Sequence, residues 1–278
     1  MIRLLGNLEK MSHASIQPVY VLSPEVANQL AQQETNLSEN DLLQQMKKII
    51  RASGLKTVKP PIILKEKINS RRSEVKCLID YCKEKHISMI AVATHARHGF
   101  PRLMLGSFAE TLLLLSSLPL VFVNPLETAP RSIKKIFFPT DLGESSKKAI
   151  TCTVNLADAL KAKLQIYSIL HIYRRGVLLT QDVGGMSFPM WITIDEAKEK
   201  GKSFLNIAKK KRVAAEFKCE EAMGSVVDAL LKELVKSKAD LISIAAEPLP
   251  KLPMMIGSVT RQLVRRASRP IYIYRPVS

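Results

Sequence analysis

The sequence predicts an α/β protein made of two tandem, doubly wound parallel-sheet domains. Its 278 residues suffice for two domains of ordinary size, at about 150 residues each. Short apolar runs alternate with segments of helical period, which is typical of parallel strands joined by helical crossovers. This pattern occurs twice. We therefore expect domains at residues 1–129 and 130–278, the first of them lacking its N-terminal strand.

The second half contains a full set of alternating elements. The predicted strands are 133–139, 163–172, 213–220, 239–246 and 271–274, and the predicted helices are 147–160, 195–211, 226–236 and 258–267. Ser145 or Ser146 can cap the first helix, and residues 173–191 have the composition of an irregular loop. This order predicts a flavodoxin-like or Rossmann-like sheet of strand order 3-2-1-4-5, with any ligand at the carboxyl ends of the strands.

The first half repeats this plan with one strand missing. The predicted helices are 4–14, most of 24–52, 73–85 and 107–116, and the predicted strands are 16–22, 61–68, 87–93 and 118–123. Nothing before residue 4 matches the strand 133–139 of the second half. That strand is central in the order 3-2-1-4-5, so its absence leaves two inner strand edges unpaired.

The composition excludes several classes of protein. The formal net charge is +17, and most of the excess lies in the second half. We interpret it as a solvated basic surface, although an anionic partner is an alternative. Cys77, Cys82, Cys152 and Cys219 lack metal-ligand spacing, which favours free thiols and a cytoplasmic protein. Residues 103–123 read as a buried helix and strand, and we expect no membrane span.

One segment carries a family resemblance. Residues 93–107 read Ala-Thr-His-Ala-Arg-His-Gly-Phe-Pro-Arg-Leu-Met-Leu-Gly-Ser. This resembles the signature of the universal stress protein family, in which Gly, two residues, Gly and nine residues precede a Gly followed by Ser or Thr. Phe138–Asp141, Gly224 and 240–242 resemble other positions of the same family. The resemblance covers nearly the whole chain as two tandem copies.

The resemblance implies a nucleotide site in each copy, with an aspartate at the adenosine end and the glycine loop at the phosphates. Backbone amides at a helix start would hold the phosphates. The candidate residues are Thr94, His95, Ala96, Arg97, Gly99, Arg102, Gly106, Ser107, Asp141, Gly257 and Ser258. Neither copy has both ends. The first has Ala93 and Ala96 in place of glycines and no aspartate strand, while the second has prolines and Glu247 in its loop.

Several candidates have a structural alternative. Ser107 and Glu110 have the spacing of a capping box, and Asp141 has the setting of a turn aspartate. His95 and His98 have no third ligand, so no metal site is predicted. The run 209–212 and the set Arg261, Arg265, Arg266 and Arg269 could contact an anion, but no motif for specific nucleic-acid readout is present.

The predicted function is that of a non-catalytic, cytoplasmic stress-response factor with degenerate nucleotide sites, acting through protein partners. No nucleophile elbow, phosphate-binding lysine loop or zinc motif is found, so no catalytic residue and no enzyme activity are predicted. No cofactor is certain. ATP is the candidate for the first half, if upstream sequence or a partner chain supplies the missing strand. A second alternative is non-specific binding of nucleic acid or an anionic surface through the basic second half.

The resemblance also implies how the halves associate. Members of the family commonly pair their last strands, which here are residues 120–123 and 271–274. Such pairing within one chain would cover two exposed sheet edges, and a homodimer of tandem chains could follow.

Overall fold

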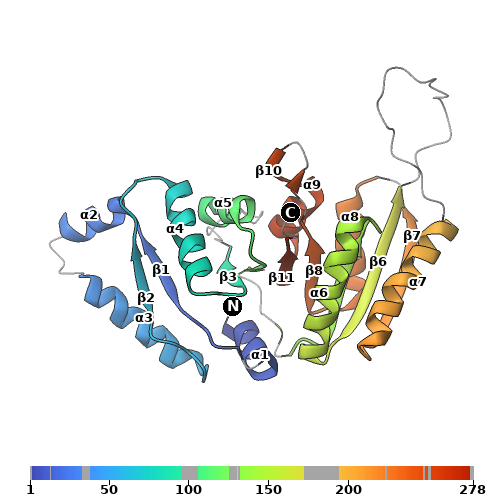
Figure 1. Ribbon diagram of the computed structural model, residues 1–278, viewed down its shortest axis with the longest axis horizontal. Helices are drawn as coiled ribbons and strands as arrows, with labels where there is room; N and C mark the ends of the chain where they lie inside the picture. The colour runs from blue at the N-terminus through green and yellow to red at the C-terminus, as the bar shows by residue number, and fades with distance from the viewer. Residues whose placement is uncertain are drawn as a thin grey trace, which may run out of the picture.

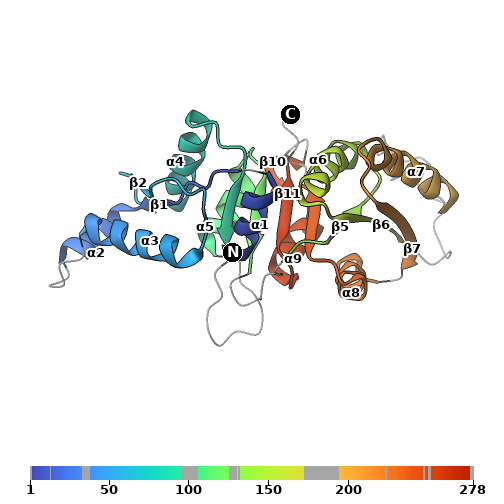
Figure 2. The same cartoon turned by 90° about the horizontal axis from the view of Figure 1, so that it is seen from below.

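The structure is a computed structural model. It describes residues 2–12, 14–32, 38–94, 106–124, 130, 132–171, 194–222, 224–246, 248–249 and 252–275. Within these residues the two halves share one seven-stranded sheet of order β3-β4-β11-β8-β5-β6-β7 (Figures 1 and 2). The strands are β3 (Ile90–Ala93), β4 (Leu120–Val123), β5 (Lys135–Thr140), β6 (Lys163–His171), β7 (Ala215–Ala222), β8 (Leu241–Ala245) and β11 (Ile271–Tyr274).

The second half confirms the predicted plan. Its strands run β7-β6-β5-β8-β11 and are parallel to their neighbours, which is the order 3-2-1-4-5. The helices are α6 (Glu144–Leu160), α7 (Ile194–Lys210), α8 (Val226–Ser237) and α9 (Ser258–Arg266). Figure 2 shows α6 and α7 on one face of the sheet and α8 and α9 on the other. Ile136 and Phe138 pack into the core cluster of α6 and α7, and Phe137 packs into that of α8 and α9.

The last strands of the two halves pair within the chain, as predicted. β4 and β11 are antiparallel, with Leu120 opposite Ile273, Val121 opposite Tyr272 and Phe122 opposite Ile271. A twofold rotation that exchanges the two strands places the Leu120–Ile273 pair on the Phe122–Ile271 pair. It leaves the central Val121–Tyr272 pair in place. The junction therefore has the register of a pseudo-twofold interface, and every strand residue in it is buried.

Helices on both faces of the sheet support this junction. On one face, Leu4 and Leu8 of α1 (Ile2–Ser12) pack in the core cluster that also contains Ile150 of α6. On the other face, the guanidinium of Arg265 in α9 donates to Glu110 of α5 (Ser107–Leu115) at 2.7 Å. The two halves are thus held together by apolar packing, a strand pair and an ion pair.

A buried arginine adds a further contact between the halves. Arg275, at the end of β11, donates to the carbonyls of Leu113 and Leu114 at 2.8 and 2.9 Å. These carbonyls belong to the last turn of α5, where the helix has no further amides of its own to bond them. Arg275 therefore caps a helix of the other half.

The first half contains the predicted break in its sheet. β1 (Val19–Leu22) and β2 (Ile62–Lys65) form a separate parallel pair that does not join β3 (Figure 1). The helices α2 (Pro24–Gln32), α3 (Glu39–Ser53) and α4 (Arg71–Glu84) accompany this pair. The segment predicted as mostly helical over 24–52 contains two helices, because Ser38 and Asp41 form a capping box that starts α3.

Two local predictions are wrong. Neither Ser145 nor Ser146 caps α6, because Gly143 is the N-cap residue and the Ser146 hydroxyl donates to Asp141 instead. The prolines after β8 predict a stiff loop, but the segment contains the antiparallel hairpin of β9 (Pro248–Leu249) and β10 (Leu252–Ile256). The predicted loop 173–191 and the domain boundary near residue 129 lie outside the described residues.

Two further observations concern the segments considered for membranes and metals. No helix in the described ranges has the length and apolar character needed to cross a membrane. The described part of 103–123 forms α5 and β4, which contribute to the core. All four cysteines are free, with Cys82 buried and the others half-buried.

Candidate functional site

The candidate residues that the structure describes lie at two opposite ends of the strands of the sheet. Thr94 follows β3, and Gly106 and Ser107 begin α5, whereas Asp141 follows β5. Gly257 and Ser258 begin α9. Because β4 and β11 are antiparallel, the carboxyl ends of the strands of the two halves point in opposite directions. The phosphate end of one half and the aspartate of the other therefore cannot combine into one site.

The other candidates are not placed. His95, Ala96, Arg97, Gly99 and Arg102 lie outside the described residues. Thr94, which precedes them, is buried and is used within the sheet. Its amide and its hydroxyl both donate to the carbonyl of Val123, at 2.9 and 3.4 Å.

Asp141 makes local contacts typical of a turn aspartate. Its Oδ1 accepts from the amide of Gly143 at 2.9 Å and from the hydroxyl of Ser146 at 2.7 Å. Leu142 between them has a φ of 62°, in the left-handed region, with its side chain buried. The Thr140 hydroxyl accepts from the Leu142 amide at 2.9 Å and holds the turn from the other side. One carboxylate oxygen of Asp141 therefore stabilises the start of α6.

A proline separates two strands at the point where a doubly wound sheet binds ligands. β5 pairs with β8 only at Ile136 and Phe137, although β5 continues to Thr140. The Lys135 carbonyl accepts from the amide of Asp240, just before β8. Every second residue of a strand directs its backbone groups to the same neighbour, so the backbone of Pro139 also faces β8. Proline has no amide to donate, which accounts for the end of this ladder. The local sequence around Pro139 does not indicate this role, because it depends on the pairing of β5 with β8.

The chain after β8 is part of the interface between the halves. β10 contacts α5, and Ile256 at the end of β10 is buried in the core cluster that includes Leu112 of α5. In this position the resemblance implies an open glycine loop. Here a hairpin packs against the other half, and its prolines provide no amides for a phosphate.

The helices that follow these loops begin without side-chain caps. Gly106 is the N-cap residue of α5 and Gly257 that of α9, and neither receives a capping bond from a side chain. The alternative of a capping box formed by Ser107 and Glu110 is wrong, because Ser107 is the first helical residue and Glu110 accepts from Arg265. Among the described residues, the N-cap position of each of these helices is therefore a glycine, which has no side chain to bond the first-turn amides.

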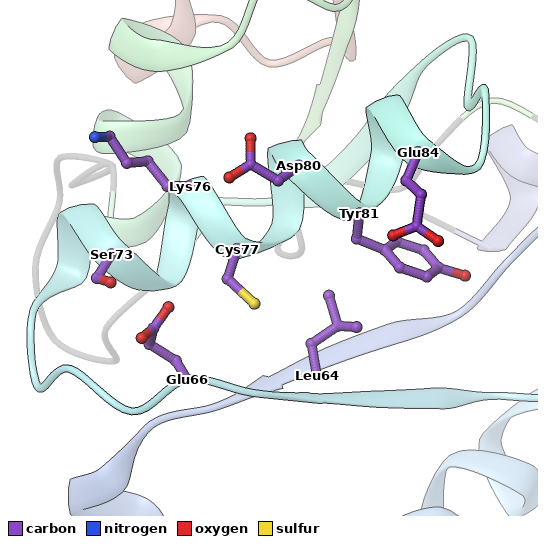
Figure 3. Close-up of a pocket in the computed structure, with 8 residues that line it drawn as sticks. All are labelled: Leu64, Glu66, Ser73, Lys76, Cys77, Asp80, Tyr81 and Glu84. Atoms are coloured by element: carbon purple, nitrogen blue, oxygen red, sulfur yellow. The ribbon is translucent and has the colours of Figure 1, made fainter.

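The described residues also contain a cavity of about 520 Å³ between β2 and α4, and none of the described candidate residues lines it. In Figure 3, Leu64, Glu66 and Cys77 point into the space between strand and helix. The lining residues are Leu64, Glu66, Ser73, Lys76, Cys77, Asp80, Tyr81 and Glu84. Sequence reasoning did not find this cavity, because its walls come from two separate elements.

Electrostatics make this cavity unsuitable for a nucleotide. Three carboxylates line it against one ammonium group, so phosphates would be repelled. The Ile68 and Lys67 amides donate to Glu66 at 2.9 and 2.7 Å, and the Ile68 bond is the main cause of its lowered pKa. Burial, followed by the charges of Glu66 and Asp80, raises the pKa of the Cys77 thiol. In the part of the chain that is described, no cluster of side chains could hold a metal ion.

Most of the arginines that were considered as an anion contact already have partners. Three of these four arginines are paired within the chain: Arg265 binds Glu110, Arg266 binds Asp228, and Arg269 donates to the Ala239 carbonyl at 3.0 Å. The run 209–212 at the end of α7 remains exposed.

Known proteins share this sequence pattern and this fold. The sequence model of the universal stress protein family matches residues 1–124 and 132–275. The universal stress protein YxiE of Bacillus subtilis (strain 168) is 28% identical over 148 residues, which are 51% of this chain and 98% of that protein.

Two solved structures resemble the whole chain. A universal stress protein of Archaeoglobus fulgidus DSM 4304 has a TM-score of 0.71 at 15% identity, covering 99% of this chain and 92% of the other. A functionally unknown protein of Pseudomonas aeruginosa PAO1 has a TM-score of 0.62 at 12% identity, covering 99% and 87%. At these identities the likeness shows the flavodoxin-like fold, whereas the family match covers both halves. The chain therefore belongs to the universal stress protein family, as a tandem member with two copies of the domain.

Proposed function

We propose that this chain is a non-catalytic stress-response protein whose two nucleotide sites are degenerate and which acts through protein partners. The observation that carries the proposal is the position of the two site ends. In each half one end is missing or is used for structure, and the antiparallel junction places the remaining ends at opposite edges.

The second half supports the proposal through its local contacts. Asp141 is bonded to Gly143 and Ser146, and the segment in the place of the glycine loop is a hairpin that contacts α5. A nucleotide would have to compete with the turn at one end and with the domain interface at the other. We infer that this half contributes stability to the chain and does not bind nucleotide.

The first half supports the proposal through its topology. Among its described residues no strand takes the place of β5, and no aspartate follows a central strand there. We propose the domain limits 1–129 and 130–278 for the two copies. Free cysteines are typical of a reducing compartment, and we propose the cytoplasm as the location.

The test is a search for bound and bindable nucleotide. Freshly purified protein is denatured, the released small molecules are chromatographed for adenine nucleotides, and the protein is titrated with Mg-ATP in a calorimeter. We expect no nucleotide and no heat of binding up to millimolar ATP. Recovery of ATP near one molecule per chain would contradict the proposal.

A second candidate function is ATP binding by the first half, with ATP as the cofactor. It is favoured by the uncapped first turn of α5, which begins at Gly106 and Ser107 and can offer amides to an anion. Gly106→Val and Ser107→Ala would then abolish binding, while Gly257→Val in the second half would preserve it. A Cβ at Gly257 meets nothing within 4 Å, which makes this variant a matched control.

A further inference from the structure

The sheet of the first half is interrupted between β1 and β3, and we call the strand position between Val19–Leu22 and Ile90–Ala93 the open position. Among the described strands, β1 pairs only with β2 and β3 only with β4. The equivalent position in the second half is occupied by β5, which lies between β6 and β8. The open position is therefore the place of an interior strand.

Backbone groups of β3 face the open position. The amides of Ile90 and Thr94 donate to carbonyls on the β4 side, at 3.0 and 2.9 Å. Alternate residues of a strand direct their amides to opposite neighbours, so the amides of Ala91 and Ala93 point away from β4. They form one unpaired edge.

β1 presents the matching edge. The carbonyls of Pro18 and Leu22 accept from amides at the two ends of β2, both at 3.0 Å. By the same alternation, the amides of Val19 and Val21 point away from β2. An extended segment between the two edges could pair with both strands in parallel, as β5 does in the second half.

Two helices span the open position and hold its edges to common cores. On one face, Val19, Val21 and Val92 pack against the cluster that contains Val75 and Leu78 of α4. This face of the first half is therefore covered by apolar side chains from α4 across the break.

On the other face, α1 contacts both sides of the break. Leu4 and Leu8 pack in the cluster against which Ala91 of β3 lies. The buried carboxylate of Glu9 accepts from the amides of Lys56 and Thr57, in the loop that leads to β2, the first of them at 2.7 Å. Both layers of a doubly wound domain are thus present around the open position.

Burial shows which segment would fit there. In the second half, Ile136–Pro139 of β5 are all buried, with side chains entering the core on both faces. In the first half, three of the four residues of β1 and three of β3 are only half-buried. A segment in the open position therefore needs a continuous apolar run, since both of its faces would be covered.

We propose that the open position binds an extended apolar segment of a partner protein, which adds to the sheet as a parallel strand between β1 and β3. Strand addition of this kind uses main-chain hydrogen bonds for affinity and side-chain pockets for specificity. The inference rests on the proposed function, because it takes over the idea of a protein partner. It adds where and how that partner is held. A second copy of this chain is disfavoured, because an inserted strand needs both edges free and every described strand already pairs with at least one neighbour.

The probe is a fluorescent peptide with the sequence of residues 134–141, which include the strand that fills the equivalent position. Its anisotropy is measured on titration with the full chain. We expect saturable binding, and at least about tenfold slower hydrogen exchange at Val21 and Ala91 when peptide is present. Absence of saturable binding up to millimolar protein would overturn the proposal, whatever the result with ATP.

Proline substitutions on strand edges test where the peptide binds. Ala91→Pro removes an amide that faces the open position and should weaken binding at least about tenfold. Glu221→Pro is the matched control, because Glu221 is exposed and its amide points to the outer edge of β7. This variant should leave peptide binding unchanged. Equal binding by both variants would refute the assignment. If Ala91→Pro fails to fold, the exchange measurement on the unmodified chain decides. Concentration-dependent dimerisation that the peptide suppresses would assign the position to a second copy and overturn the partner proposal.

Discussion

A charge at the junction of the halves should destabilise the whole chain. Val121 is 2% exposed and lies opposite Tyr272 at the centre of the β4–β11 pair. In Val121→Asp the lost burial of valine costs about 2 kcal/mol. Desolvation can raise the pKa of a buried carboxyl by about 3 units, which adds about 4 kcal/mol at neutral pH. The combined loss of about 6 kcal/mol is comparable to the total stability of a typical domain.

Urea unfolding followed by circular dichroism measures this loss. Val235→Asp is the control, since Val235 is 70% exposed on α8 and its variant should change the free energy of unfolding by less than about 1 kcal/mol. The new carboxyl at position 121 has a folded pKa above its unfolded value of about 4, so the penalty is full at high pH and shrinks as pH falls through the raised pKa. Equal midpoints for the two variants at neutral pH would show that the junction does not stabilise the chain.

Three further substitutions test single contacts by urea unfolding. Gly201→Ala should lower the free energy of unfolding by about 1–3 kcal/mol, because the new Cβ would lie 2.4 Å from the ring of Phe217. Gly257→Ala is the control and should be neutral. Equal free energies of unfolding for the two variants would contradict the close packing of α7 on β7. Asp141→Ala should cost about 1–2 kcal/mol through two lost hydrogen bonds and leave calorimetric titrations with ATP unchanged. Arg275→Met should cost about 2–3 kcal/mol, because it leaves the buried Leu113 carbonyl and the part-buried Leu114 carbonyl without this donor, and a neutral result would show that this cap contributes nothing.

Much of the architecture could be predicted because it depends on local patterns. The apolar runs at 120–123 and 271–274 have the length of buried strands, and the family resemblance indicates that such last strands pair. The structure confirms this pairing and the strand order of the second half. The interrupted sheet of the first half was also predictable, since a missing central strand cannot be replaced by any neighbouring segment of the pattern.

The site was harder to predict because its contacts are non-local. Glu110 has the spacing of a capping partner for Ser107, but its partner is Arg265, which is 155 residues away. Pro248 and Pro250 favour a loop locally, yet the hairpin there contacts α5 of the other half. Pattern reasoning weighs near neighbours, so it assigned to caps and loops several residues that the domain interface uses.

The two halves depart from a complete domain in opposite ways, and this difference bears on their roles. The second half keeps its central strand. However, its aspartate stabilises the start of α6, its β5–β8 ladder ends early, and its hairpin contacts α5 at the junction. The first half keeps an uncapped helix start and both helical layers but has an open strand position. Unpaired interior edges are unstable unless something covers them, whereas a closed sheet needs no partner. We therefore propose that the first half has the binding role and that the second half, which pairs with it through β4 and β11, supports it.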